Sequence, residues 1–149
     1  MTTDFTPRLR NTEKNREIFD PVRKKYVALT PEEWVRQQFV HFLVADLQVP
    51  LSLIGVEIVI PFHGRNLRAD VVVYSRNARP LLLAECKAGD VKITPQTFMQ
   101  VAGYNLTLQV PWLVASNGEK LYCCVFNEAS AQYDFVTRMP SYSEMTTRI

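Results

Sequence analysis

The chain has 149 residues, of which 47% are hydrophobic and 21% charged, a composition that excludes a disordered or coiled-coil protein. Its formal net charge of +2 is too small to identify a nucleic-acid-binding protein, and its three cysteines form neither a disulfide framework nor a CxxC metal site. No segment has the apolar run of an export signal or a membrane span, so we expect a cytoplasmic protein that does not contact the membrane.

The first 25 residues are polar and carry charges of both signs, which predicts an amino-terminal arm that orders only on contact. A solvated arm is the default interpretation, although its basic residues hint at nucleic-acid binding: Arg8, Arg10, Lys14, Arg16 and Arg23-Lys24-Lys25. We expect one domain over residues 26–136 and a polar tail over 137–149.

A helix is predicted over residues 31–47. Thr30 is a favourable N-cap, Pro31 suits the first helical position, and Glu33 completes the pattern of a capping box. Apolar residues then recur at helical spacing until Pro50, which forbids continuation.

Most of the remaining chain alternates between β-branched runs and turn signals. The expected elements are strands over 54–62, 67–74 and 81–87, a helix from Thr94 to about residue 108, and strands over 111–116, 120–126 and 133–136. Asn117-Gly118 is the strongest hairpin signal. This order predicts an α/β fold with a central mixed sheet flanked by helices, in which three strands form a meander and a crossover helix leads to the next.

Two acidic residues stand at the ends of apolar runs, Asp70 before Val-Val-Val and Glu85 after Leu-Leu-Leu-Ala. A buried carboxylate is costly without a compensating charge, and a hard divalent metal such as Mg²⁺ would supply one. Lys87 follows Glu85 by two residues and so points to the same face of its strand. The competing interpretation is that Asp70 begins one strand while Glu85 and Lys87 end another in solvent.

A longer set of residues resembles the amino-terminal nuclease domain of type I restriction enzyme R subunits, which has the PD-(D/E)xK restriction-endonuclease-like fold. The matching segments are Pro31 to Gln37, Glu57, Arg68-Ala69-Asp70, Glu85-Cys86-Lys87, Gln100-x-x-x-Tyr104 and Ser116-Asn117-Gly118. The resemblance covers about residues 25–128, and Ala69 replaces the proline of the family pattern. It implies a restriction-endonuclease-like core with the order αβββαβ.

The resemblance also implies a function: a DNA endonuclease, or nuclease module of a restriction system, that depends on Mg²⁺ or Mn²⁺. Asp70, Glu85 and the backbone carbonyl of Cys86 would hold the metal, and Lys87 would orient or help deprotonate the attacking water. The chain has no GxxxxGK[ST] phosphate loop, so it lacks the ATP-driven motor of the R subunits.

Two other functions stay open: a catalytically silent nucleic-acid-binding or assembly module with the same fold, and a structural domain whose acids have no catalytic role. The expected partners are DNA and subunits of a restriction system. The oligomeric state is open, a homodimer included.

Gln100 and Tyr104 stand four residues apart and so share a helix face, and the resemblance implies that they support contact with nucleic acid. The resemblance also implies a first-helix glutamate that reaches toward the metal water. Glu32 shares a face with Val35, which would point it to the sheet, while Glu33 lies on the neighbouring face, and the choice between them stays open.

Arg36 is able to pair with Glu33 or to contact phosphate, and the ion pair is favoured. Glu57 would accept from Arg68 across the hairpin and so support the site without binding metal. The side chain of Cys86 is expected to pack in the core. His41 and His63 receive no role.

Overall fold

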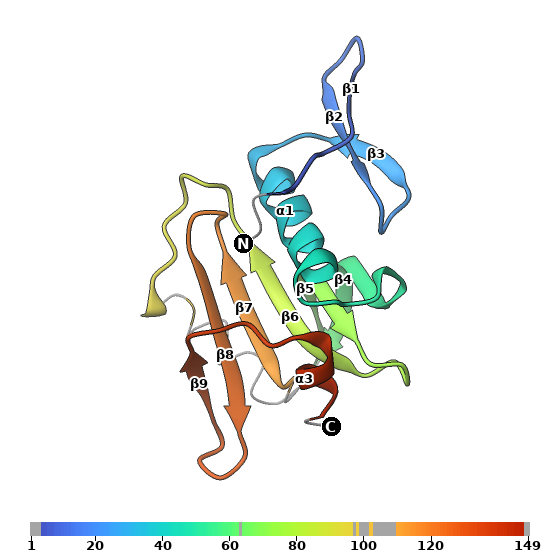
Figure 1. Cartoon of the computed structure of the whole chain (residues 1–149). Helices are drawn as coiled ribbons and strands as arrows, with labels where there is room; N and C mark the ends of the chain where they lie inside the picture. The colour runs from blue at the N-terminus through green and yellow to red at the C-terminus, as the bar shows by residue number, and fades with distance from the viewer. Residues whose placement is uncertain (1–3, 63, 97, 99–101, 103–109, 148–149) are drawn as a thin grey trace.

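The computed structural model describes residues 4–62, 64–96, 98, 102 and 110–147. They form a small antiparallel sheet, a larger mixed sheet and flanking helices (Figure 1). The small sheet contains β1 (Leu9–Asn11), β2 (Arg16–Asp20) and β3 (Lys25–Ala28). The large sheet contains β4 (Ile54–Phe62), β5 (Arg65–Tyr74), β6 (Pro80–Cys86), β7 (Trp112–Ser116), β8 (Leu121–Asn127) and β9 (Gln132–Val136). The helices are α1 (Pro31–Ala45), the short 3-10 helix η1 (Leu51–Leu53) and α3 (Tyr142–Thr146).

The large sheet has the strand order β4-β5-β6-β7-β8-β9. Neighbouring strands are antiparallel except β6 and β7, which are parallel, with Glu85 opposite Ala115. A parallel pair requires a crossover connection, so the predicted meander followed by a crossover is confirmed. The described residues of that connection include four helical positions: Pro95, Gln96, Phe98 and Ala102. Gln100 and Tyr104 lie outside the described residues.

Alternate residues of each strand face opposite sides of the large sheet and build two apolar cores. On β5, Val71 and Val73 face α1 and α3, whereas Val72 faces Phe98 and Ala102. The sheet is therefore covered on both faces. None of the described helices has the length and apolar character needed to cross a membrane.

The amino-terminal segment is a sheet rather than the predicted arm. Ile18 and Asp20 of β2 are fully buried, and Val22 packs against the main core. Polar composition misled the prediction because Asp20 is buried with a partner, Arg23, and the short strands each contribute only one to three apolar residues.

The carboxyl-terminal segment also differs from the expected polar tail. Ser141 and Glu144 form a capping box that begins α3, and Met145 of this helix is fully buried. Tyr142 fixes the helix in place, because its backbone N–H donates to the carbonyl of Leu47 at 2.8 Å and its hydroxyl to that of Tyr74 at 3.1 Å. The capping box was the signal that could have revealed this helix.

Because α3 contributes to the main core, Met145→Ala should lower the free energy of unfolding by about 2–5 kcal/mol, the usual loss for a truncated core side chain. Ser143→Ala, an exposed change on the same helix, is the matched control and should leave stability nearly unchanged. Thermal or denaturant unfolding measures both. Equal stabilities of the two variants would show that α3 does not belong to the core.

Candidate active site

The candidate site lies where β5 and β6 part. Val71 pairs with Ala84, and the next step of this register would place Asp70 opposite Glu85. The ladder ends there, and the carboxylate of Asp70 accepts a hydrogen bond from the backbone N–H of Cys86 at 2.7 Å. A side-chain oxygen therefore replaces a backbone acceptor. This holds the buried Asp70 at the end of β6, beside Glu85 and Lys87.

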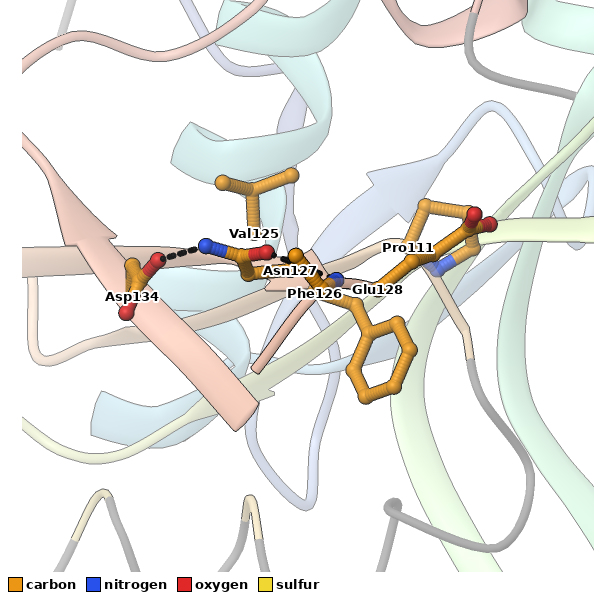
Figure 2. A pocket seen from close by; sticks show the side chains of 7 residues that line it. Pro111, Val125, Phe126, Asn127, Glu128 and Asp134 are labelled. Carbon is orange, nitrogen blue, oxygen red and sulfur yellow. Dashed lines mark hydrogen bonds between the residues drawn. The ribbon is translucent and has the colours of Figure 1, made fainter. Parts of the chain in front are cut away.

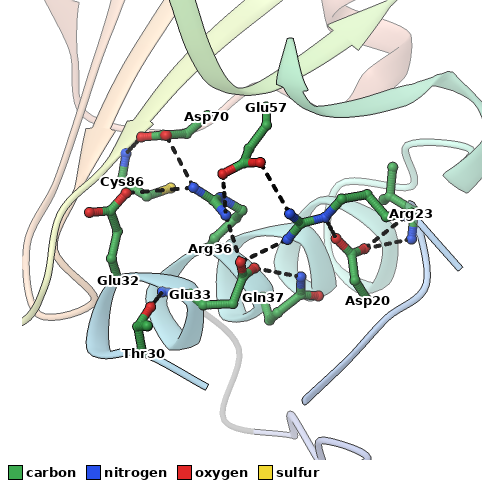
Figure 3. Close-up of polar contacts among 11 residues, drawn as sticks. Asp20, Arg23, Thr30, Glu32, Glu33, Arg36, Gln37, Glu57, Asp70 and Cys86 are labelled. Atoms are coloured by element: carbon green, nitrogen blue, oxygen red, sulfur yellow. Dashed lines mark hydrogen bonds and ion pairs between the residues drawn. The ribbon is translucent and has the colours of Figure 1, made fainter. Parts of the chain in front are cut away.

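The second oxygen of Asp70 faces Arg36 of α1, with 3.3 Å between Oδ1 and Nη2 (Figure 3). Arg36 is only 4% exposed and also pairs with Glu33 at 2.6 Å, while Gln37 donates to the other oxygen of Glu33 at 3.0 Å. An unpaired charge at this depth would cost several kcal/mol, so these groups stabilise one another only as a set. The set joins α1 to β5.

Arg23, from the turn after β2, extends this ion network to the small sheet. It pairs with Asp20, with Glu33 at 2.7 Å and with Glu57 of β4 at 3.3 Å. Glu57 is also 3.5 Å from Arg36 and has a φ of 54° in the middle of its strand. A non-glycine residue in this region carries backbone strain, which the two arginine contacts help to offset.

Glu85 and Lys87 lie at the end of β6. Lys87 Nζ is 3.2 Å from Glu85 Oε1. The side chain of Lys87 is 46% exposed and that of Glu85 is 30% exposed. Burial and the negative charge of Asp70 raise the pKa of Glu85, and Lys87 offsets only part of this effect. The hydrogen bond with Glu85 raises the pKa of Lys87, which is therefore protonated at neutral pH.

Two residues of the hairpin between β7 and β8 hold the segment that follows β6. The N–H of Lys87 donates to the carbonyl of Ser116 at 2.9 Å, and the side-chain amide of Asn117 donates to Val91 at 2.9 Å. Gly118 has a φ of 88°, and a Cβ here would lie 3.3 Å from Gln38 of α1, so glycine suits both the turn and the close approach. The hairpin thus positions Lys87.

Negative charge exceeds positive charge across the site. The ion pairs connect six carboxylates with only three cations: Asp20, Glu32, Glu33, Glu57, Asp70 and Glu85 with Arg23, Arg36 and Lys87. Carboxylate oxygens are the donors that Mg²⁺ prefers, so this donor set fits such an ion. However, no cluster of three or more His, Cys, Asp or Glu side chains is ready to hold a metal within the described part of the chain, and Asp70 is engaged by Arg36.

The two candidate glutamates of the first helix differ in surroundings. Glu33 is buried in the ion network, whereas Glu32 is half exposed and turns its carboxylate toward Cys86 and Asp70, as Figure 3 shows. Helical periodicity would instead have pointed Glu32 toward the sheet. The small sheet explains the difference, because it covers a second face of α1 that solvent would otherwise contact.

Other expectations can now be compared with the structure. The favoured ion pair between Arg36 and Glu33 is present. Glu57 contacts Arg23 and Arg36, and Val59 lies opposite Arg68, so the expected contact between Glu57 and Arg68 across the hairpin is wrong.

The thiol of Cys86 is 1% exposed in the main core, and burial raises its pKa, which leaves it a packing group. Arg23 and Asp20 were missed by the sequence argument because their segment looked like an arm. The alternation of Glu17-Ile18-Phe19 before Asp20-Pro21 was an available strand-and-turn signal.

A surface hollow of about 500 Å³ lies away from these residues (Figure 2). Pro111, Phe126 and Glu128 are among its lining residues, and Asn127 donates to Asp134 across it at 2.9 Å. It lies beside the start of β7, whereas Lys87 contacts the end of that strand. None of the predicted catalytic residues lines this hollow, so it adds nothing to the candidate site.

Comparisons with known proteins give two matches. The sequence model of a family described as "Type I restriction enzyme R protein N terminus" matches residues 31–140. Among solved structures, the fragment of a putative HsdR subunit of a type I restriction enzyme from Vibrio vulnificus is similar, with a TM-score of 0.55 and 19% identity. The match covers 80% of this chain and 25% of that chain, so this chain spans about a quarter of that protein. The curated proteins contain no match.

Arg36→Ala should be strongly destabilising, by about 3–5 kcal/mol, because it leaves the buried carboxylates of Glu33 and Asp70 without their cation. Arg138→Ala is the matched control. It removes an exposed pair with Glu144, and such pairs contribute little. Urea unfolding of both variants measures the difference. If the two arginines were equally dispensable, the buried network would not hold α1 to β5.

Glu85→Gln should melt at a higher temperature than the wild type at pH 7–8. A carboxyl with a raised folded-state pKa stabilises the fold fully below its unfolded value, and this stability is lost as pH rises through the folded pKa. The advantage of the glutamine should therefore disappear at about pH 4, below the ordinary value of 4.5. Exposed Glu128→Gln is the control. A lower melting temperature for Glu85→Gln at pH 7 would mean that its pairing with Lys87 dominates.

Proposed function

Because this chain belongs to the family of type I restriction enzyme R protein N termini, we propose that it is a nuclease module that hydrolyses DNA with the help of Mg²⁺ or Mn²⁺. The observation that carries the proposal is the excess of carboxylate over cationic charge where β5 and β6 part, next to a protonated lysine. It would act within a restriction system, together with the other components of that system.

Asp70, Glu85 and the backbone carbonyl of Cys86 would hold the metal ion. When bound, the ion supplies a Lewis acid that lowers the pKa of its water and neutralises charge on the phosphate. The raised pKa of Glu85 is due first to burial and then to repulsion by Asp70, and a cation between the two carboxylates would offset that repulsion, which supports this assignment. Arg36 compensates Asp70 in the absence of metal and would then share that carboxylate with the ion.

Lys87 would stabilise the negative charge that develops on the phosphate during cleavage. Its raised pKa favours this role over that of a base, since a lysine that stays protonated cannot accept a proton from water. Its half-exposed ammonium is accessible to a phosphate, and the hairpin after β7 holds its backbone in place.

Four further residues would support the reaction. Glu32, half exposed and turned toward the site, would orient the metal-bound water, while Glu33 fixes Arg36. Gln100 and Tyr104 would contact the DNA backbone, as the family resemblance implies. Neutral hydrogen bonds to a phosphate contribute less than a positioned cation, so these two residues would affect binding more than the chemical step.

One observation favours a second function, that of a nucleic-acid-binding module without catalysis. Both oxygens of Asp70 already have partners, the N–H of Cys86 and the guanidinium of Arg36. If Arg36 did not give way, the metal would lack a ligand. The protein would then bind DNA and leave it uncut.

Lys87→Ala should reduce DNA cleavage at least about a hundredfold, the typical loss when one charge-stabilising group is removed, while the fold persists. The assay offers linear, supercoiled and single-stranded DNA with Mg²⁺ or Mn²⁺. Lys92→Ala, an exposed lysine five positions further along, is the control and should cut at the wild-type rate. Cleavage that persists in Lys87→Ala would point to a contaminant or another site.

Metal binding is followed separately, by the thermal shift that Mg²⁺ produces. The wild type and Lys87→Ala should both gain stability, because an ion bound only by the folded state stabilises it. The double variant Asp70→Ala, Glu85→Ala should not respond. A wild type that binds DNA but cuts none of the three substrates would replace the nuclease by the binding module.

A further inference from the structure

The small sheet β1–β3 carries most of the excess positive charge of this chain. Residues 4–28 contain seven basic and four acidic residues, a net charge of +3, whereas the whole chain has only +2. The sheet also precedes residues 31–140, the region that matches the family model. It is therefore a basic addition in front of the candidate nuclease domain.

The two faces of this sheet differ in character. Ile18 and Asp20 are fully buried on one face. Phe19 lies opposite Tyr26 on the other face, with their ring centroids 5.3 Å apart. The alternation along β2 thus places the aromatic pair on the face opposite Ile18, where Arg8 and Phe19 also line a hollow with Val40 and His41 of α1.

Two arginines stack on this aromatic pair. The guanidinium carbon of Arg8 lies 4.4 Å from the centroid of Phe19, and that of Arg10 lies 4.0 Å from the centroid of Tyr26. Both arginines are exposed, although Arg10 also pairs with Glu17 at 2.7 Å. Stacking holds the guanidinium groups in one place, so less side-chain freedom is lost when they contact an anion.

A second basic element lies at the turn between β2 and β3. Lys24 and Lys25 are exposed there, directly after Arg23. Arg23 contacts Glu33, Glu33 contacts Arg36, and Arg36 contacts Asp70, so a chain of ion pairs links this turn to the candidate site. Figure 1 shows the small sheet at the end of the molecule toward which β6 points.

We propose that the aromatic face and the basic turn of the small sheet, through the exposed side chains of Arg8, Arg10, Lys24 and Lys25, bind the phosphate backbone of duplex DNA and hold it beside the candidate site. This inference rests on the proposed function for the choice of DNA as the polyanion. Stacked arginines and exposed lysines without a base-reading element bind phosphates regardless of sequence. The sheet would thus supply affinity, and the residues at Asp70 the chemistry.

The test measures binding of a fluorescent DNA duplex in the Lys87→Ala background without metal, so that cleavage has no part in the readout. Two double variants are compared: one carries Arg8→Gln and Arg10→Gln, the other Lys24→Gln and Lys25→Gln. Each should weaken binding at least about tenfold at 0.1 M salt. The slope of log K against log salt should fall by about 1 for each phosphate contact removed. The lysine variant touches no aromatic ring, so it stays informative if the arginine variant folds poorly.

Two controls distinguish binding by the small sheet from a general effect of changing the net charge of the protein. Arg76→Gln, Arg79→Gln removes two exposed charges from the turn at the opposite end of β6 and should leave binding nearly unchanged. Glu17→Gln removes the acid beside Arg10 and should tighten binding. Neither result follows if the sheet is only structural.

Equal losses in the variants of the sheet and of the Arg76 turn would overturn the inference, as would tighter binding to a matched RNA duplex or to anionic vesicles. The outcome of this binding test is separate from that of the nuclease proposal. A wild type that binds through the sheet but cuts no DNA would support the inference and refute the nuclease, whereas cleavage with binding independent of the sheet would do the reverse.

Discussion

The guanidinium of Arg36 is the group on which this structure most depends. It lies almost fully buried between Glu33 on its own helix and Asp70 on β5, and without it both carboxylates would be buried charges with insufficient compensation. This requirement fixes the rotation of α1 against the sheet. It also explains why the helix uses only half of its capping box: Glu33 donates its backbone N–H to Thr30 and commits its side chain to the arginines.

Asp70 determines where the sheet opens. Its carboxylate occupies the N–H of Cys86 that a continued ladder would use, so β5 and β6 separate after Val71 and Ala84. The residues beyond this point, Glu85 and Lys87, are therefore free to project from β6. A single side chain both satisfies the end of β6 and provides the site with a buried negative charge.

The large sheet could be predicted from the sequence because most of its strands contain an apolar or β-branched run bounded by turn signals, such as Pro80 and Asn117-Gly118. The acids beside these runs, Asp70 and Glu85, followed from the same pattern. Arg23 could not be assigned, because its partner Glu57 lies far along the chain and no local pattern records that contact. Glu33 was ambiguous because helical periodicity assumes one solvent face, and α1 is covered on two sides.

The amino-terminal segment is fastened to the domain by ion pairs as well as by apolar contacts. Arg23 pairs with Glu33 of α1 and Glu57 of β4, Val22 packs against the main core, and the ring of Phe5 contacts those of Trp34 and His41 on α1. Salt screens the pair with Glu57, whose side chain is 43% exposed, more than the pair with the buried Glu33, and it does not weaken the apolar contacts. The segment before α1 therefore depends in part on charge for its attachment to the domain. Its amide protons should exchange through openings that leave the six-stranded sheet intact, and these openings should become more frequent as ionic strength rises.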